Sequence, residues 1–249
     1  MMIVWGAVMV LALIGMIVCS KKQKTNPAMQ PVAFVLFVVV VVGGIMLLRE
    51  TGTFGGGQSS LMKSELAFYA SQGNKVGQYF AQSNGGKKIL LLVEDTADES
   101  AKLLADALKA GYKGEVVMDT VIPPPTIGSD NPIPPFLQMK ASDFDAAFEK
   151  HADAGIVVSL IGLPQDAAKM KFWKAAADKR PAFLLIGLPS GQMTGLAVLV
   201  ASGNLTGIVI PKPNAKYDIT APSDPNAAFD IRYVLVDKSN IEQYKSQLM

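Results

Sequence analysis

Two long apolar segments near the N-terminus most constrain what this 249-residue chain can fold into. The first, residues 1–20 (MMIVWGAVMVLALIGMIVCS), has no charged residue, and the second, residues 32–48, reads VAFVLFVVVVVGGIMLL. A helix that spans a bilayer needs about 17–25 mainly apolar residues, whereas an unpaired strand would leave its backbone unsatisfied in lipid. We therefore expect residues 1–49 to form a transmembrane helical hairpin, with spans at about 2–20 and 31–48.

A cleaved signal peptide is the alternative interpretation of the first segment. Such a peptide begins with a basic region, and no Lys or Arg precedes Lys21. A lipoprotein cleavage site would need a small residue before the cysteine, but Val18 precedes Cys19. We expect a retained anchor helix, with Cys19 as a small apolar residue at the membrane edge.

The flanking charges predict how the hairpin is oriented. The connection between the segments carries Lys21, Lys22 and Lys24, whereas Arg49 alone follows the second segment. The positive-inside rule then places the Lys21–Lys24 loop in the cytoplasm and both termini outside. The expected location is the inner (cytoplasmic) membrane of a bacterium, where the bacterial source is inferred from the family resemblance described below.

The rest of the chain excludes several classes of function. Residues 50–249 contain 19 basic and 21 acidic residues, so we expect no nucleic-acid partner, which would need a basic excess. One Cys cannot form an intrachain disulfide, and one Cys with one His leaves almost no Cys/His metal site. No glycine-rich dinucleotide or phosphate-binding motif follows a predicted strand. We therefore expect neither a cofactor nor a metal.

The chain after the hairpin is predicted to contain a connector and one domain. Residues 50–86 comprise a Gly/Ser-rich linker followed by an amphipathic helix over 61–83, which Gly73 and Asn74 weaken. Residues 87–249 alternate between apolar runs and amphipathic segments. The expected strands are 88–94, 114–122, 154–163, 181–188, 205–211 and 231–236. The expected helices are 95–110, 142–152, 164–178, 194–202 and 240–248.

This alternation predicts the α/β fold class. Two N-terminal transmembrane helices would precede a single three-layer, extracytoplasmic domain with a mostly parallel, Rossmann-like sheet. In detail, Asp95 or Thr96 is the expected N-cap of the first domain helix and Gly111 its stop. Asp145 occupies the capping-box position of the helix that begins at Ser142.

Two short stretches near the C-terminus carry a resemblance to a known family. They are VASGNLTGIVIPKP and RYVLVDKSNIEQYKSQ, and their matching positions are Gly203, Leu205, Thr206, Val209, Val236, Asn240 and Tyr244. Together with AGIVVSLIGLP upstream, they resemble type 1 periplasmic sugar-binding proteins over roughly residues 87–248. That resemblance implies a periplasmic-binding-protein-like sheet and two lobes that close on a ligand. This chain has residues for one lobe, so a partner would have to supply the other wall before a small ligand is well buried.

The carboxyl ends of the strands are the expected location of a ligand site in such a fold. The ligand-binding candidates there are Glu94, Asp95, Asp119, Ser159, Ser190 and Lys212. The acidic residues after the first strand suit a cation or sugar hydroxyls. The alternative is that they cap the following helix and stabilise its dipole. Glu94-Asp95 and Lys212-Pro213 also resemble a response-regulator receiver, but Ser159 and Leu160 stand where its phosphate-accepting Asp should end the third strand.

The candidates for a partner surface are aromatic and proline residues. Residues 123–139 form a long proline-rich loop, and such loops suit protein contacts. The candidates are Pro123, Pro124, Pro125, Pro134, Pro135, Phe136, Phe172 and Trp173. Phe172 and Trp173 would either stack on a sugar ring or pack within the protein. His151 lacks an evident nucleophile, and the sequence around Ser190 does not match a nucleophile elbow, so we expect no enzyme.

Three functions remain open at this point. The first is a non-enzymatic accessory or structural subunit of an envelope assembly, in contact with the lipid bilayer and with other membrane or envelope proteins or with itself. Glycines at 6, 15, 43 and 44 would permit the close helix contacts of such an assembly. The second is an anchored sugar-like solute-binding module that works as a half-clamp, with a partner or as a homodimer. The third is an enzyme that uses the acidic cluster.

Overall fold

The computed structural model describes residues 57–121, 138–187 and 195–248, together with scattered positions between 12 and 44. The chain divides into two units, Met1–Ser64 and Glu65–Met249. Most of both predicted spans and the start of the linker lie outside the described residues. Among the helices of the described part, none combines the length and apolarity that crossing a bilayer requires.

The first unit brings one of the predicted glycines against the second apolar segment. Gly15 and Leu36 both have helical backbone. A Cβ atom added to Gly15 would lie 3.0 Å from Cδ1 of Leu36, whereas one added to Gly44 would meet nothing within 4 Å. Gly15 therefore lies against the side chain of Leu36, whereas Gly6 and Gly43 lie outside the described residues.

A six-stranded sheet forms the centre of the second unit, in the order β2-β1-β3-β4-β5-β6. The strands are β1 (Lys88–Val93), β2 (Val116–Thr120), β3 (Ala154–Ser159), β4 (Ala182–Ile186), β5 (Gly207–Pro211) and β6 (Tyr233–Asp237). The first five are parallel to their neighbours, and β6 pairs with β5 in the antiparallel sense. The prediction of a mostly parallel α/β sheet is confirmed.

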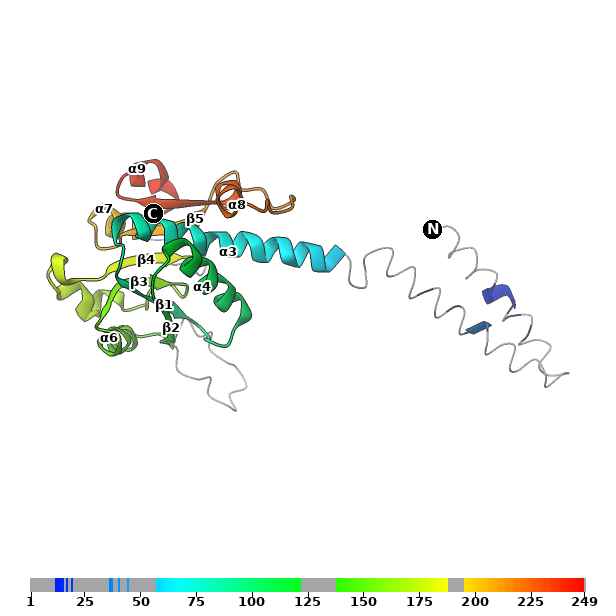
Figure 1. Ribbon diagram of the computed structural model, residues 1–249, viewed down its shortest axis with the longest axis horizontal. Coiled ribbons are helices and arrows are strands. Elements are labelled where there is room, and N and C mark those ends of the chain that lie inside the picture. Colours follow the sequence, from blue (N-terminus) through cyan, green and yellow to red (C-terminus); the bar gives the residue numbers. More distant parts are fainter. Residues whose placement is uncertain are drawn as a thin grey trace. The chain divides into compact units, whose positions relative to one another are not determined.

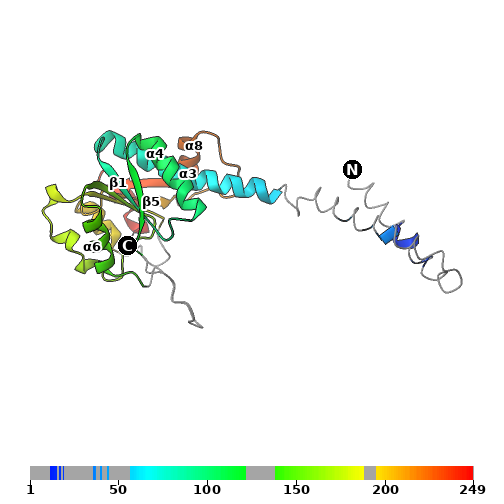
Figure 2. The same cartoon turned by 60° about the horizontal axis from the view of Figure 1, so that its bottom comes forward.

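Helices cover both faces of this sheet (Figure 1). They are α3 (Gly57–Ser83), α4 (Glu99–Tyr112), α6 (Ala141–Lys150), α7 (Leu196–Ala201), α8 (Pro225–Arg232) and α9 (Ile241–Tyr244). Figure 2 shows α3, α4 and α8 on one side and α6 on the other. Alternate strand residues point to opposite faces, so β1 divides its side chains between two cores. Ile89 and Leu91 join the α3–α4–α8 core, whereas Leu90 and Leu92 join the core beneath α6, α7 and α9.

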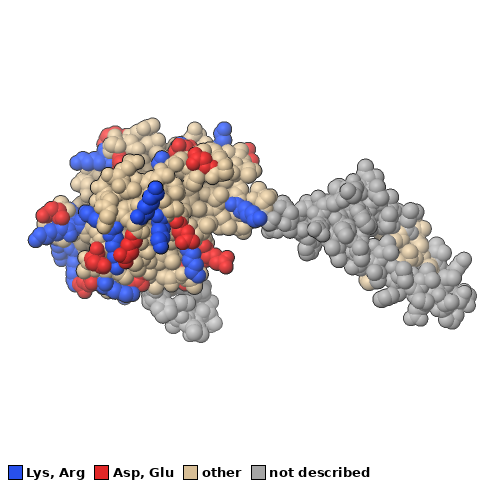
Figure 3. Space-filling model, viewed as in Figure 1, with Lys and Arg blue, Asp and Glu red and all other residues tan. Residues whose placement is uncertain are grey.

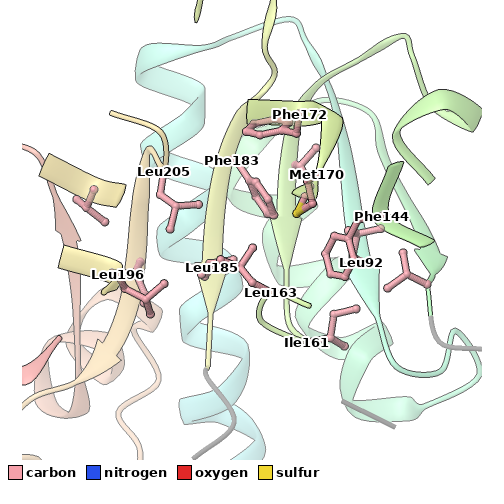
Figure 4. Packing of buried hydrophobic residues seen from close by; sticks show 14 of the residues in the cluster. Leu92, Phe144, Ile161, Leu163, Met170, Phe172, Phe183, Leu185, Leu196 and Leu205 are labelled. Carbon is pink, nitrogen blue, oxygen red and sulfur yellow. The ribbon is translucent and has the colours of Figure 1, made fainter. Parts of the chain in front are cut away.

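The predicted helix over 164–178 is wrong. The structure has three short 3-10 turns there, η1 (Ala167–Lys169), η2 (Lys171–Lys174) and η3 (Ala177–Lys179). Extended backbone at Met170, Ala175 and Ala176 separates them. The breaks let Met170 and Phe172 both bury in the core, where Figure 4 shows them beside Phe183. Tertiary packing has overridden a helical pattern.

Several helix ends also differ from expectation. Asp98, rather than Asp95 or Thr96, caps α4 by accepting hydrogen bonds from the backbone of Ser100 and Ala101. The helix continues through Gly111, and the turn to left-handed backbone falls on Lys113 at φ 59°.

The prediction also differed from the structure at the start of α6 and at the helix before β6. The side chain of Asp143, rather than Asp145, accepts from the N–H of Lys140 at the start of α6. Helix α8 was not predicted, although Asp224 before Pro225 is an ordinary helix-start signal.

Gly73, which was expected to weaken α3, and Gly77 instead let this helix cross α4 closely. A Cβ at Gly73 would lie 2.4 Å from the carbonyl oxygen of Leu104, and one at Gly77 would lie 2.3 Å from that of Leu108. Gly111 on α4 makes the reciprocal approach to the carbonyl of Asn74 at 2.3 Å. Helix α3 is continuous because packing against α4 compensates for the weak helix propensity of glycine.

Candidate functional site

The strand order reverses direction between β1 and β3. From β1 the chain moves to β2 on one side and then to β3 on the other. In open α/β sheets this reversal leaves a crevice outside the carboxyl ends of the two strands, where ligands bind. Glu94 and Asp95 follow β1 at this edge, Thr120 ends β2 and Ser159 ends β3. The fold thus places three of the predicted ligand-binding residues, Glu94, Asp95 and Ser159, at the same end of the sheet.

The acidic residues after β1 divide between local structure and free surface. Asp95 is exposed, and its Oδ1 accepts from the N–H of Ala97 at 2.8 Å. Glu94 is exposed and its carboxylate has no partner among the described residues, although its backbone carbonyl accepts from the hydroxyl of Thr120 at 3.1 Å. The capping interpretation therefore applies to Asp98, whereas Glu94 and one oxygen of Asp95 remain open to a ligand.

Hydrogen bonding explains the acidity of the true cap. Desolvation opposes the charged form of Asp98, but hydrogen bonds from Ala101 and Ser100 outweigh it and lower the pKa of its carboxyl. An ionised carboxylate at this position also suits the positive end of the helix dipole.

Ser159 is committed to its own turn. It is fully buried, its hydroxyl donates to the carbonyl of Gly162 at 2.8 Å, and its oxygen accepts from the N–H of Ile161 at 3.3 Å. Gly162 has φ +74°, so this turn ends β3 four residues earlier than the sequence suggested. The Ser159 hydroxyl is therefore buried and already uses its proton within the turn.

Among these candidates, Lys212 is described and the loop residues are not. The ammonium of Lys212 donates to the backbone carbonyl of Asp230. Ser190 lies outside the described residues. The same holds for the proline-rich candidates Pro123, Pro124, Pro125, Pro134, Pro135 and Phe136.

Asp119 faces the end of α6. Its Oδ2 accepts from Lys150 Nζ at 2.8 Å and lies 2.8 Å from His151 Nε2. Burial opposes its charged form, but the hydrogen bonds from Lys150 and His151 outweigh it and lower the pKa of the Asp119 carboxyl. His151 is the C-cap of α6, the position expected for a helix-terminal cation. This arrangement fixes α6 against β2.

The two candidate aromatics of the 3-10 segment belong mainly to the core. Phe172 is 7% exposed and lies 5.4 Å, centroid to centroid, from Phe183. Trp173 is half-buried and donates from Nε1 to the carbonyl of Ala167 at 2.6 Å. Of the two interpretations, internal packing is the one that the structure shows for Phe172.

The structure also contains a cavity that the sequence did not predict. Its volume is about 270 Å³, and it lies between the end of α6 and the segment 171–181, at the amino ends of β3 and β4. The sequence feature related to this cavity is a set of three aromatic residues, Phe148, Phe172 and Phe183. They are far apart in the chain, and their rings come into contact only in the folded protein.

Comparison with known proteins gives structural neighbours alone. No protein-family profile matches the chain, and no curated protein matches it. A carbohydrate transporter from Acidothermus cellulolyticus, solved with myo-inositol, is 14% identical with a TM-score of 0.45, covering 72% of this chain and 60% of that one. A glucose-galactose binding protein from Geobacillus stearothermophilus is 14% identical with a TM-score of 0.44, covering 70% and 61%.

A third neighbour has a similar extent. The fructose-binding periplasmic domain of a hybrid two-component system is 15% identical with a TM-score of 0.45, covering 72% of this chain and 59% of that one. All three are transport or binding proteins. The chain spans about 60% of the length of each of these three proteins.

Proposed function

We propose that residues 87–249 form a non-enzymatic, extracytoplasmic binding module for a small sugar-like solute, anchored by the N-terminal hairpin. The observation that carries this proposal is the reversal of strand order between β1 and β3, with the carboxylate of Glu94, which has no partner among the described residues, just beyond the carboxyl end of β1. Carboxylates accept hydrogen bonds from hydroxyl donors, and a charged acceptor makes each bond stronger. The sugar-like class is the one that the family resemblance of residues 87–248 implies.

The module would work as a half-clamp. One lobe supplies one wall of a crevice, whereas small-ligand sites usually bury 70–90% or more of the ligand. The second wall would come from another envelope protein or from a second copy of this chain. A role within a membrane assembly is then part of the same proposal, because ligand burial depends on the partner.

The test is a thermal-shift screen on the full-length protein in mild detergent. The panel is glucose, galactose, ribose, fructose and myo-inositol, and the particle mass is measured in parallel. A sugar at 100 times its Kd should stabilise the protein by about 2.7 kcal/mol. The double variant Glu94→Gln/Asp95→Asn should abolish the shift.

Asp106→Asn is the matched control, because Asp106 is an exposed carboxylate on α4 with no ion pair among the described residues. If no sugar shifts the melting temperature and the protein co-purifies with a stoichiometric membrane partner, the module is an assembly subunit rather than a sugar binder. A sugar shift that survives the double variant would place the ligand elsewhere.

A further inference from the structure

The cavity at the amino ends of β3 and β4 has an apolar floor. Leu90, Val157 and Phe172 are at most 7% exposed and line it from β1, β3 and η2. Phe148 of α6 completes an aromatic wall, 5.5 Å from Phe172 between ring centroids. At about 270 Å³ it lies just below the ~300–1,000 Å³ of pockets for drug-sized ligands, which suits a smaller molecule. The cavity lies at the amino ends of the strands, whereas the proposed sugar site lies at their carboxyl ends.

Asp145 places a carboxylate within this wall. The residue is 8% exposed, and its Oδ1 accepts from the N–H of Lys171 at 2.9 Å. Oδ2 makes no hydrogen bond with any described residue. Among the described residues, every fully buried side-chain oxygen or nitrogen has a hydrogen-bond partner. Because Oδ2 of Asp145 has none, it is not fully buried. Asp145 is one of the residues that line the cavity. A largely buried carboxylate with an unused oxygen favours a cationic donor in the cavity.

Cations stand at the mouth of the same cavity. Lys179 is exposed and its ammonium has no hydrogen-bond or ion-pair partner among the described residues. Arg180 donates to Oδ1 of Asn204 at 2.7 Å and lies over the ring of Phe172, 5.8 Å from its centroid. Lys171 is neutralised by Glu149 at 2.9 Å. The mouth therefore keeps a positive group for an anionic ligand atom, while the wall keeps a negative one.

We propose that this cavity binds a small zwitterion with an apolar side chain, of the aromatic or branched aliphatic α-amino acid class. The ammonium group would bind Oδ2 of Asp145, the carboxylate would face Lys179 and Arg180, and the side chain would contact Phe148 and Phe172. A simple aromatic acid would leave the Asp145 carboxylate unpaired against another anion. A sugar would leave most of its hydroxyls against the apolar floor.

Calorimetric titration of the full-length protein tests the ligand class. L-Phenylalanine and L-leucine are compared with 3-phenylpropionate, which lacks the ammonium, with phenethylamine, which lacks the carboxylate, and with glucose. We expect at least one amino acid to bind, and each truncated analogue to bind about tenfold or more weakly than phenylalanine, since a hydrogen bond to a charged group contributes about 1.5–3 kcal/mol. Absence of amino-acid binding at millimolar concentration, or equal affinity for 3-phenylpropionate, overturns the proposal.

Three variants locate the binding. Asp145→Asn keeps an acceptor for the N–H of Lys171 but removes the charge, so it should weaken phenylalanine about tenfold and strengthen 3-phenylpropionate, which no longer meets a second anion. Asp178→Asn, an exposed carboxylate of η3 outside the cavity, is the control and should bind as the wild type does. Ala175→Phe should fill the cavity and abolish binding with Asp145 intact, which covers the case that Asp145→Asn fails to fold.

The two proposals fail separately. Unchanged phenylalanine affinity in both Asp145→Asn and Ala175→Phe would overturn the amino-acid site. Loss of phenylalanine binding in Glu94→Gln/Asp95→Asn, with binding intact in Asp145→Asn, would place the amino acid in the crevice and likewise overturn it.

Discussion

Arg232 connects three parts of the second unit through one guanidinium. It is 1% exposed and pairs with both oxygens of Glu65 on α3, at 2.6 and 2.8 Å. Its Nε donates to the carbonyl of Lys216 at 2.8 Å, and its Cζ lies over the ring of Phe68, 3.4 Å from the ring centroid. The N–H donors of the buried guanidinium are therefore hydrogen-bonded, and these contacts hold α3 against the end of α8.

Replacing this side chain should be among the more destabilising single changes. Arg232→Ala removes packing against Phe68 as well as the hydrogen bonds, whereas Glu65, at 54% exposed, regains water. We expect the free energy of unfolding to fall by about 2–3 kcal/mol, measured by urea denaturation of the full-length protein. Lys174→Ala, at an exposed position, should stay within about 0.5 kcal/mol. A loss below 1 kcal/mol for Arg232→Ala would mean that the clamp contributes little.

The same pair predicts a pH dependence. The hydrogen bond from Arg232 lowers the pKa of Glu65 from 4.5, so its stabilising contribution is complete above pH 4.5 and is lost as the pH falls through the lowered value. Because Glu65 is half exposed, screening limits the contribution to at most about 1 kcal/mol.

The wild type should therefore exceed Glu65→Gln in unfolding free energy at pH 7, with the gap closing as the pH falls from 4.5 toward 3. Denaturation curves at pH 7, 4.5 and 3 measure this gap. Asp106→Asn, which removes an exposed carboxylate of α4, is the control and should stay within about 0.5 kcal/mol of the wild type at pH 7. A gap for Glu65→Gln that does not narrow would indicate that the charge of Glu65 is not what stabilises the pair.

Among the elements, α3 and α4 can cross closely because glycines without a Cβ atom lie at the contact. A glycine-to-alanine change in a helix ordinarily stabilises by about 0.5–1 kcal/mol. At Gly73 the added Cβ would lie 2.4 Å from a backbone oxygen of α4, so the helices must separate. We expect Gly73→Ala to reduce the free energy of unfolding by about 2–3 kcal/mol instead.

Gln82→Ala, at an exposed position near the end of α3, serves as the reference for helix propensity. It should change stability by no more than about 0.5 kcal/mol. Thermal melts of both variants would decide the matter, and a stabilised Gly73→Ala protein would contradict the close crossing.

How far the sequence predicts the elements depends on what determines each one. The inner strands were predictable because continuous apolar runs such as Leu90 to Val93 are buried on both faces of a parallel sheet. The 3-10 segment was not, because Met170 and Phe172 satisfy a helical period equally well and only the shape of the core selects separate turns. The N-cap of α4 was predicted too early, at Asp95 or Thr96, because the choice of the capping residue depends on how the chain leaves β1 and Asp98 is the residue that caps the helix.

The candidate site was predictable to a smaller extent. Alternating strands and helices gave the carboxyl edge and hence Glu94, but nothing in the chain order shows that Ser159 turns back on Gly162. The cavity could not be predicted from the sequence, because Asp145 and Lys171 lie 26 positions apart and come into contact only when α6 packs on η2.

For the whole molecule, charge distribution and topology are linked. Figure 3 shows basic and acidic side chains interspersed over one face of the second unit. On that face, such mixing gives no field of one sign. The expected placement of this unit outside the membrane follows from the charges around the predicted spans.

Thiol labelling can test that placement, because Cys19 is the only cysteine. In a Cys19→Ser background, a single cysteine replacing exposed Lys174 should react with a membrane-impermeant maleimide in intact spheroplasts. One replacing Lys22 should react only after the membrane is permeabilised, because the positive-inside rule places that loop in the cytoplasm. The reverse pattern would invert the topology, and equal reactivity of both would contradict the hairpin.

The position of Glu65 has a mechanical consequence. Glu65 is the first residue of the second unit, and further along α3 the side chains of Phe68, Val76 and Phe80 are fully buried. A force applied along α3 from its N-terminal end would load the Glu65–Arg232 pair first and the apolar contacts afterwards. Rupture would then begin at a short-range polar bond that re-forms readily when tension is released, and the hydrophobic packing of α3 would yield only under a larger pull.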